Sequence, residues 1–322
     1  MKLGVLTNLF GHLPLEEVCA KLEALGVEAV EIGCGGYPGR DHADPAVLLA
    51  DDAKLEEFKA TLDRHGMVLA CLSCHGNPVH PDPAVAKSFD DDFHNAVLLA
   101  EKLGVDTVVT FSGCPGGSPE DKTPNWVTCP WPDDFGKILD YQWNEVLIPY
   151  WKKTAEFAKA HGVTKIAFEM HPGFCVYNPE TLLRLRAAVG DVIGANFDPS
   201  HLIWQGIDPV AAIRALEGAI YHFHAKDTKV DTYNTAVNGV LDTKSYGDEI
   251  HRSWIFRAVG YGHGADYWRD IISNLRLVGY DKVMSIEHED SLMTQEEGLA
   301  KAAKFLRESI IAEPRPGDMR WF

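Results

Sequence analysis

Four apolar segments in the second half of the chain each end in a side chain that can bind a metal ion. In chain order these end residues are Glu169, Asp198, His224 and Glu287. Carboxylate oxygens with one imidazole nitrogen suit Mn²⁺, Mg²⁺, Co²⁺ or Zn²⁺, whereas a thiolate-rich set would indicate structural zinc or an iron–sulfur cluster. We therefore expect a site for one divalent cation, with a coordination position open to oxygen atoms of a substrate.

Each of these residues has a simpler interpretation when it is taken alone. A single glutamate at a strand end is more often the partner of a salt bridge than a metal ligand. Four such ends on consecutive strands are far less frequent by chance, and three clustered carboxylates repel one another unless a cation lies between them. The group as a whole predicts a metal site, provided that the four segments converge in space.

The elements that would bring these residues together are short apolar segments that alternate with segments of helical periodicity. The expected strands span residues 2–7, 27–33, 67–75, 105–111, 163–169, 192–198, 219–225 and 282–288. The expected helices include residues 15–25, 53–65, 93–103, 142–161, 179–189, 267–278 and 295–311. This alternation predicts parallel strands with helical crossovers.

Eight parallel strands close a (β/α)8 barrel, or TIM barrel. A doubly wound open sheet gives a similar pattern, but it usually has a glycine-rich turn after its first strand. Residues 7–12, which follow the first strand here, read Thr-Asn-Leu-Phe-Gly-His and are not such a turn. We expect the barrel, in which the carboxyl ends of all strands meet at one mouth and so join the four candidate ligands.

One domain is expected over residues 1–322, because barrels of this kind reach this length as a single unit. Two insertions follow the fourth and seventh strands, residues 112–135 and 227–264. Both contain aromatic residues, in which disordered segments are poor, so ordered lids or oligomer contacts are expected. The C-terminal tail, residues 312–322, ends in two aromatics and is expected to dock, either on this chain or on a neighbouring subunit.

Composition and charge exclude several classes of function. The formal net charge is -17, and we find no basic patch of the kind that binds nucleic acid or an anionic membrane. No apolar run approaches the roughly 18 residues of a membrane span. The amino terminus enters a strand at once and shows no signal peptide. We expect a cytoplasmic protein that acts on a small molecule.

Seven cysteines are scattered along the sequence and are expected to be reduced. Cys71 and Cys74 form a CxxC motif, a pattern found in zinc and redox sites. The motif lies at the end of an apolar strand, and no second pair accompanies it. We favour two thiols without a zinc or redox role.

The sequence resembles the xylose isomerase-like barrels, a family of sugar phosphate isomerases and epimerases that includes inosose- and ketose-handling enzymes. The resemblance extends over essentially the whole chain. The segments that carry it are residues 168–169, 196–201 (Asn-Phe-Asp-Pro-Ser-His), 224–227 (His-Ala-Lys-Asp), 260–262 (Gly-Tyr-Gly) and 285–289 (Ser-Ile-Glu-His-Glu). It implies that the metal ligands are Glu169, Asp198, His224 and Glu287, and Mn²⁺ is the ion that we expect.

The resemblance also implies roles in catalysis. Glu169 and Glu287 are the expected acid–base pair, which would move protons on either face of a carbon beside a carbonyl that the metal polarises. His201 is expected to face the substrate, and Lys226 is expected to orient hydroxyl oxygens or to support a developing oxyanion. The implied activity is that of a metal-dependent isomerase or epimerase of carbohydrate metabolism.

Two assignments within this set stay open. Glu289 is a rival to Glu287 as a ligand, because residues two apart on a strand point to the same side. Family position favours Glu287. His222 has the same relation to His224, and we expect it to be a histidine of the barrel interior with satisfied hydrogen bonds.

Further strand-end groups are expected to complete the substrate pocket. His75 would bond a substrate hydroxyl or act as an acid or base, unless it only caps the turn that follows. His12, Glu31 and His171 are further candidates at other strands. Trp126 would stack on a sugar face, unless it packs against its own loop. We find no glycine-rich phosphate cradle or arginine cluster, so we expect an unphosphorylated sugar, inosose or keto-glycoside.

Three rival functions remain. A lyase or dehydratase acting on an inosose or 3-keto-glycoside, including one that cleaves a C-glycoside, needs the same metal and base, and the long loops favour a bulkier substrate than a free ketose. An apurinic endonuclease shares the barrel, but it uses more metal ligands and grips phosphates with basic residues. A non-catalytic sugar-binding module would need a vestigial metal site. As partners we expect a second copy of the chain and consider a small accessory subunit.

Overall fold

The structure is a computed structural model that describes residues 1–314. Eight parallel strands form a closed barrel in the order β1, β10, β7, β6, β5, β4, β3, β2. Their bounds are β1 Lys2–Leu6, β2 Ala29–Gly33, β3 Val68–Ser73, β4 Thr107–Thr110, β5 Lys165–Glu169, β6 Ile193–Phe197, β7 Ile220–Ala225 and β10 Val283–Ile286. The prediction of a TIM barrel is confirmed, and every barrel strand lies within the range expected from the sequence.

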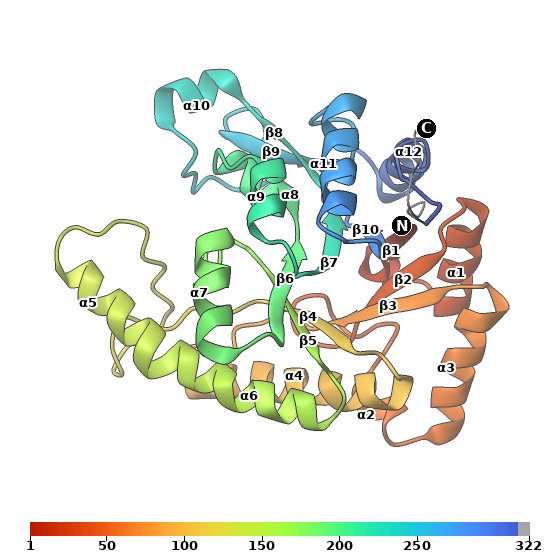
Figure 1. Cartoon of the computed structure of the whole chain (residues 1–322), viewed down its shortest axis with the longest axis horizontal. Coiled ribbons are helices and arrows are strands. Elements are labelled where there is room, and N and C mark those ends of the chain that lie inside the picture. The colour runs from red at the N-terminus through yellow and green to blue at the C-terminus, as the bar shows by residue number, and fades with distance from the viewer. Residues whose placement is uncertain (315–322) are drawn as a thin grey trace, which may run out of the picture.

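Helices surround this barrel (Figure 1). The longer ones are α1 Leu15–Ala24, α3 Asp52–Arg64, α4 Pro83–Leu103, α6 Ile148–Ala160, α7 Pro179–Val189, α11 Ala265–Leu277 and α12 Gln295–Arg307. The shorter ones are η1 Thr7–Phe10, α2 Pro45–Leu48, α5 Asp134–Asp140, the π-helical η2 Tyr141–Leu147, α8 Pro199–Trp204, α9 Pro209–Ala215 and α10 Thr232–Asn238. Most of the short helices were not expected, because one or two turns are too short to show a helical period.

Two helices begin earlier than their apolar pattern predicts. The helix expected over residues 93–103 starts at Pro83, because the Asp82 side chain accepts a hydrogen bond from Ala84 N at 2.8 Å and so caps the first turn. Proline at the first position has the backbone angle of a helix and loses no hydrogen bond there. The helix expected over residues 142–161 is likewise extended, since α5, η2 and α6 follow one another without a break.

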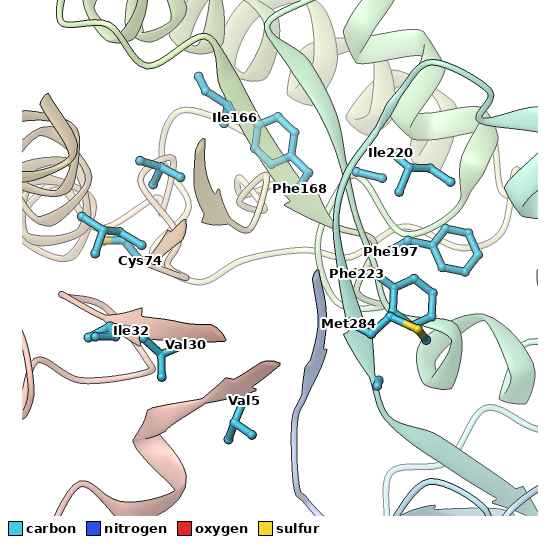
Figure 2. Packing of buried hydrophobic residues seen from close by; sticks show 14 of the residues in the cluster. Val5, Val30, Ile32, Cys74, Ile166, Phe168, Phe197, Ile220, Phe223 and Met284 are labelled. Carbon is cyan, nitrogen blue, oxygen red and sulfur yellow. The ribbon is translucent and has the colours of Figure 1, made fainter. Parts of the chain in front are cut away.

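The hydrophobic core lies mainly between the barrel and its helices. Figure 2 shows part of it, with Phe168, Phe197 and Phe223 among the buried side chains. The Phe168 ring contacts Trp151 of α6 at a centroid distance of 4.6 Å, and the Phe197 and Phe223 rings stack at 5.8 Å. Burying a side chain of this size stabilises the fold by about 1.5–3 kcal/mol. These large side chains therefore fix which face of each strand looks outward.

The insertion after β7 forms secondary structure outside the barrel. It contains β8 Asp227–Val230 and β9 Trp254–Arg257, which pair antiparallel, and α10 between them. In Figure 1 α10 projects from the barrel, and none of its residues is buried. The insertion after β4 is irregular as far as α5. Of the C-terminal tail, residues 315–322 lie outside the described part, so the expected docking of its aromatics stays a prediction.

Candidate metal centre and active site

Each of the four predicted ligands directly follows a large side chain of the outer core. These pairs are Phe168-Glu169, Phe197-Asp198, Phe223-His224 and Ile286-Glu287. Because successive side chains of a strand point to opposite faces, an outward hydrophobe turns the next residue into the barrel. Packing of the outer core thus orients all four predicted ligands toward the mouth of the barrel, where the carboxyl ends of the strands lie.

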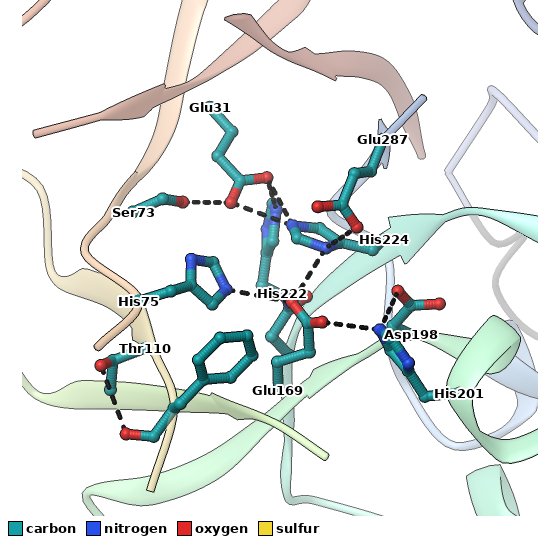
Figure 3. Close-up of polar contacts among 12 residues, drawn as sticks. Glu31, Ser73, His75, Thr110, Glu169, Asp198, His201, His222, His224 and Glu287 are labelled. Atoms are coloured by element: carbon teal, nitrogen blue, oxygen red, sulfur yellow. Dashed lines mark hydrogen bonds and ion pairs between the residues drawn. The ribbon is translucent and has the colours of Figure 1, made fainter. Parts of the chain in front are cut away.

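The four side chains meet there. One ligand atom from each of Glu169, Asp198, His224 and Glu287 lies within 4.8 Å of the others. His224 Nδ1 is 3.3 Å from Glu169 Oε2 and 3.2 Å from Glu287 Oε2. Figure 3 shows the two glutamates on opposite sides of this imidazole. The donors are the oxygen and nitrogen atoms that the sequence predicts for a divalent ion.

Two buried atoms of this cluster, Asp198 Oδ2 and His224 Nδ1, make no aligned hydrogen bond within the described part of the chain. Their near neighbours are charged groups: Lys226 Nζ lies 3.1 Å from Asp198 Oδ2, and two carboxylates lie 3.2 and 3.3 Å from His224 Nδ1. The other oxygen of Asp198 is already used, because Oδ1 accepts from Ser200 N at 2.8 Å and caps α8. Buried polar atoms without partners are costly in a folded protein. A cation between them would satisfy both, so the residues fit a bound ion.

The pKa values of the clustered carboxylates are also shifted by their surroundings. Burial raises the pKa of Asp198, and the negative charges of Glu169 and Glu287 raise it further, although Lys226 and His201 oppose them. Burial would also raise the pKa of Glu169, but the His201, His224 and His75 imidazoles outweigh it and hold that pKa well below its ordinary value. A cation bound among these carboxylates would offset the repulsion that raises the pKa of Asp198.

Lys226 supplies the permanent positive charge of the site. Its side chain is only 2% exposed, and Nζ lies 2.6 Å from Glu287 Oε2, 3.1 Å from Asp198 Oδ2 and 2.8 Å from Glu289 Oε2. Burial would lower the pKa of Lys226, but these carboxylates raise it well above its ordinary value. Burial likewise would raise the pKa of Glu287, yet Lys226 and His224 lower it to about 2. Lys226 is thus a fixed ammonium group beside the cluster.

Three histidines surround Glu169. His75 Nε2 donates to Glu169 Oε2 at 3.0 Å, and His201 Nε2 lies 3.0 Å from Glu169 Oε1. The His171 ring lies against that of His201, with centroids 4.1 Å apart. Burial lowers the pKa of both His171 and His201, so both rings stay neutral near pH 7. The structure therefore brings together His75, His171 and His201, as expected from the sequence.

A cavity of about 140 Å³ opens over this cluster. Its lining residues are Leu6, Asn8, Tyr37, Pro38, His75, Phe111, Glu169, His171, His201, Lys226, Glu287 and Glu289. Sequence reasoning missed Asn8, Tyr37 and Phe111. Each follows a barrel strand by a few residues, so a search of every segment after a strand would have found them.

Two expected substrate-binding residues lie elsewhere. His12 is exposed and is not among the residues that line this cavity. Trp126 lines a different cavity, of about 290 Å³, where its ring meets Tyr177 edge to face at 5.5 Å. The loop of Trp126 packs against α7 rather than over the cluster. The structure thus does not bring these two residues together with the other predicted site residues, and Trp126 packs against Tyr177 of another loop and not within its own.

The insertion after β7 covers one side of the site. Phe256 of β9 is buried against it, with the Lys226 ammonium 4.7 Å above its ring and the His201 ring 5.2 Å away edge to face. Asp227 anchors the insertion, since Oδ2 accepts from His263 N at 2.8 Å, Gly262 N at 3.1 Å and Trp268 Nε1 at 3.1 Å. The aspartate of the His-Ala-Lys-Asp segment is thus a structural anchor of the wall.

The CxxC motif lies away from this chemistry. Cys71 and Cys74 are buried free thiols, and burial raises the pKa of each well above its ordinary value. Within residues 1–314, no group of side chains placed to hold a metal includes a cysteine. Reduced thiols of this kind are poor nucleophiles and poor ligands. In the same part of the chain, no helix is long and apolar enough to cross a membrane.

Two curated proteins are similar to this chain in sequence. YfiH of Bacillus subtilis (strain 168), a protein described as uncharacterized, is 42% identical over 312 residues, which cover 96% of this chain and 99% of YfiH. The rhizopine catabolism protein MocC of Rhizobium meliloti is 29% identical over 287 residues, which cover 88% of this chain and 77% of MocC.

Among solved structures, that of the IOLI protein with a bound zinc atom is similar in fold. Its TM-score is 0.65 at 20% identity, and the match covers 96% of this chain and 98% of that one. A likeness at this identity shows the fold alone. The family model of the xylose isomerase-like TIM barrels matches residues 19–309. The chain therefore belongs to the xylose isomerase-like TIM barrel family.

Proposed function

We propose that the protein is a divalent-metal-dependent isomerase or epimerase of a small, unphosphorylated keto-sugar or inosose. One observation carries the proposal: the carboxylates of Glu169 and Glu287 lie 3.3 and 3.2 Å from the same atom, His224 Nδ1, on opposite sides of the ring. A divalent ion bound by this group, for which we propose Mn²⁺, supplies a Lewis acid that polarises a substrate carbonyl. The two glutamates then face the carbon beside that carbonyl.

Glu169 is the proposed base. Its Oε2 accepts hydrogen bonds from His75 Nε2 at 3.0 Å and from Asn196 Nδ2 at 3.3 Å, which fix the orientation of the carboxylate. A carboxylate held in this way can remove the proton from the carbon beside the carbonyl. Glu287, after it has taken up a proton from solvent, can protonate the opposite face of that carbon, which inverts its configuration. Glu169 then releases the proton that it removed to solvent, so both carboxylates return to their starting state.

His201 and Lys226 are proposed to orient the substrate. Both line the cavity, both are buried, and among the lining residues within 1–314 Lys226 is the one lysine or arginine. An ammonium group and a neutral imidazole bind hydroxyl oxygens and support charge that develops on the substrate oxygen. No arginine of the described part of the chain lines the cavity, which favours a substrate without phosphate. A volume of about 140 Å³ favours a small substrate over a large glycoside.

The test is exchange with solvent deuterium. The protein is loaded with Mn²⁺ and incubated in D₂O with ketoses, inososes and 3-keto-glycosides, and products are read by NMR and mass spectrometry. An isomerase or epimerase gives sugar products that carry one deuterium at the exchanged carbon. An unsaturated product or a released aglycone would instead assign the chain to the lyases, which use the same proton abstraction.

Two variants decide whether the glutamates act as proposed. Glu169→Gln and Glu287→Gln are each expected to lower turnover by about 10²–10⁴-fold, because the amide can neither accept the proton nor carry the ligand charge. His12→Asn, at an exposed position outside the cavity, is the control that keeps full activity. Full activity and full metal content in both glutamine variants would disprove the proposal.

A further inference from the structure

Glu31 of β2 lies inside the barrel, behind His224, and is fully buried. Four side chains from three other strands donate to its carboxylate. Ser73 of β3 donates to Oε1, and Ser285 of β10 donates to Oε2 at 2.7 Å. His222 Nε2 donates to Oε2 at 2.8 Å, and His224 Nε2 lies 3.0 Å from both oxygens. Figure 3 shows the ring of His224 between Glu31 and Glu287.

This arrangement decides which nitrogen of His224 carries the proton. The carboxylate of Glu31 accepts hydrogen bonds, so the nitrogen that faces it, Nε2, must hold a proton. The other nitrogen, Nδ1, faces Glu169 and Glu287, and its electron pair becomes free when an ion takes the place of its proton. The ring is thus oriented as a metal ligand needs to be.

We propose that Glu31 is a positioning residue for the metal, which acts through His224. It fixes the ring orientation and the Nε2–H tautomer, and so presents the Nδ1 electron pair to the ion. The inference rests on the proposed metal site. A negative charge on the far side of the imidazole also makes Nδ1 a better electron donor, which strengthens binding of the ion.

Glu31, His222 and His224 also have ligand atoms within 4.8 Å of one another, so a second metal site has to be considered. The hydrogen bonds argue against it. Both oxygens of Glu31 and both Nε2 atoms already have partners. Within the described residues, the buried atoms of this region that make no hydrogen bond include His224 Nδ1 and Asp198 Oδ2, and both residues belong to the group around Glu169. The group around Glu31 is complete without an ion, whereas the group around Glu169 is not.

Glu31→Gln removes the charge and keeps the shape. An amide oxygen cannot accept from four donors, and the amide N–H atoms would face Ser73, Ser285 or an imidazole N–H. The expected result is a loss of about 10–100-fold in Zn²⁺ affinity, measured by chelator competition on the folded, ion-free protein. The matched control is Ser285→Ala, which removes one donor from the same carboxylate but leaves the bond to His224 intact, and whose affinity should stay close to that of the wild type.

A spectroscopic readout on the wild type keeps the inference testable if Glu31→Gln does not fold. NMR of Zn²⁺-loaded protein with isotope-labelled histidine should show His224 protonated at Nε2 and bonded to zinc through Nδ1. Zinc on Nε2 would overturn the inference. Unchanged Zn²⁺ affinity in a folded Glu31→Gln variant would also overturn it, as would a fall from two bound ions to one, which would make Glu31 a ligand.

These outcomes are distinct from a failure of the proposed function. If the wild type binds no divalent ion, the metal site itself is wrong and both conclusions fall. If the wild type binds one ion and Glu169→Gln abolishes turnover, the proposed function stands whatever the result at Glu31. A purely structural role for Glu31 would lower the melting temperature without moving the zinc bond from one nitrogen to the other.

Discussion

Glu287 and Glu289 stand two residues apart after β10, and their side chains differ in burial. The Glu287 side chain is 16% exposed and the Glu289 side chain is 48% exposed. Glu287 lies 3.2 Å from His224 Nδ1 and belongs to the group of four ligand atoms, whereas Glu289 contacts only Lys226 among the residues of the site. The geometry favours Glu287 as the ligand, which is the choice that the family resemblance implied.

Paired substitutions test this choice. Glu287→Gln should abolish binding of Mn²⁺ at micromolar concentration, because it removes one of three carboxylate ligands. Glu289→Gln should keep the ion and change affinity little, since an exposed charge is screened by solvent and salt. Metal content after dialysis and titration calorimetry give the measurement. Loss of the ion from Glu289→Gln with retention in Glu287→Gln would reverse the assignment.

Sequence reasoning predicted the four residues that the structure brings together but assigned no specific role to Glu31. Each of the four residues ends an apolar segment, so its position carries a signal. Glu31 is one acidic residue within the apolar run of β2, and its partners Ser73, His222 and Ser285 are 42, 191 and 254 residues away. A contact between such distant residues depends on the register of several strands, which periodicity does not give. His222 is the barrel-interior histidine that the sequence predicts, and its hydrogen bond to Glu31 confirms this.

At the scale of elements, Asp227 holds the insertion after β7 against the barrel. It is fully buried, and its oxygens accept from the backbone of residues 228, 260, 262 and 263, from the His263 ring and from the Trp268 indole. Backbone and side-chain donors of the insertion and of α11 converge on this one carboxylate. Loss of it would leave several buried donors without partners at once.

Asp227→Ala is therefore expected to cost at least about 3 kcal/mol in the free energy of unfolding. The matched control is Asp231→Ala in the same insertion. The Asp231 side chain accepts from Tyr233 N and Asn234 N and so caps the exposed helix α10, and its loss should cost about 1 kcal/mol. Urea unfolding measures both. Equal costs at the two positions would show that the Asp227 network does not anchor the insertion.

The course of the long loops was the part of the fold that the sequence predicted least well. Aromatic content correctly indicated order in both insertions, since Trp126 and Phe256 each pack in the structure. Aromatic content did not predict which part of the molecule each loop packs against, because an aromatic side chain in a loop can pack on any apolar surface within reach. For Trp126 that surface is Tyr177 beside α7, and for Phe256 it is the site. Barrel strands, in contrast, repeat a simple pattern and were predicted within a few residues.

At the scale of the whole molecule, the proposed ligands tie together four neighbouring strands. They come from the ends of β5, β6, β7 and β10, which are consecutive around the barrel. An ion that binds the native state and not the unfolded chain stabilises the fold by linkage, by about 2.7 kcal/mol at a free concentration of 100 times its Kd. Unfolding of the barrel should therefore be coupled to release of the ion.

Chelation tests this coupling. Removal of the ion with EDTA should lower the melting temperature on the order of a few degrees, and excess Mn²⁺ should restore it. Glu287→Gln should show no response to either treatment, which controls for effects of the chelator elsewhere. Differential scanning calorimetry gives the comparison. An equal shift in the variant would place the stabilising ion outside this group of ligands.

The reactivity of the cysteine thiols tests the burial described for the whole molecule. Cys129 is exposed and the other six cysteines are buried, and burial raises the pKa of Cys19 to about 11. One thiol per folded chain should react rapidly with a thiol reagent, and all seven should react in denaturant. Cys129→Ser should lose the rapid phase. Several rapid phases in the native wild type would contradict the burial described for the core.

The arrangement of the ligands also has a consequence for biosynthesis. A ribosome makes Glu169, Asp198 and His224 before Glu287, and Glu287 directly follows β10, the strand that closes the barrel against β1. A growing chain therefore cannot offer the complete ligand set until its last barrel strand has been made and paired. If the proposed site binds an ion, the identity of that ion is therefore set after folding, by the ions in the medium at that moment and not by those present during translation.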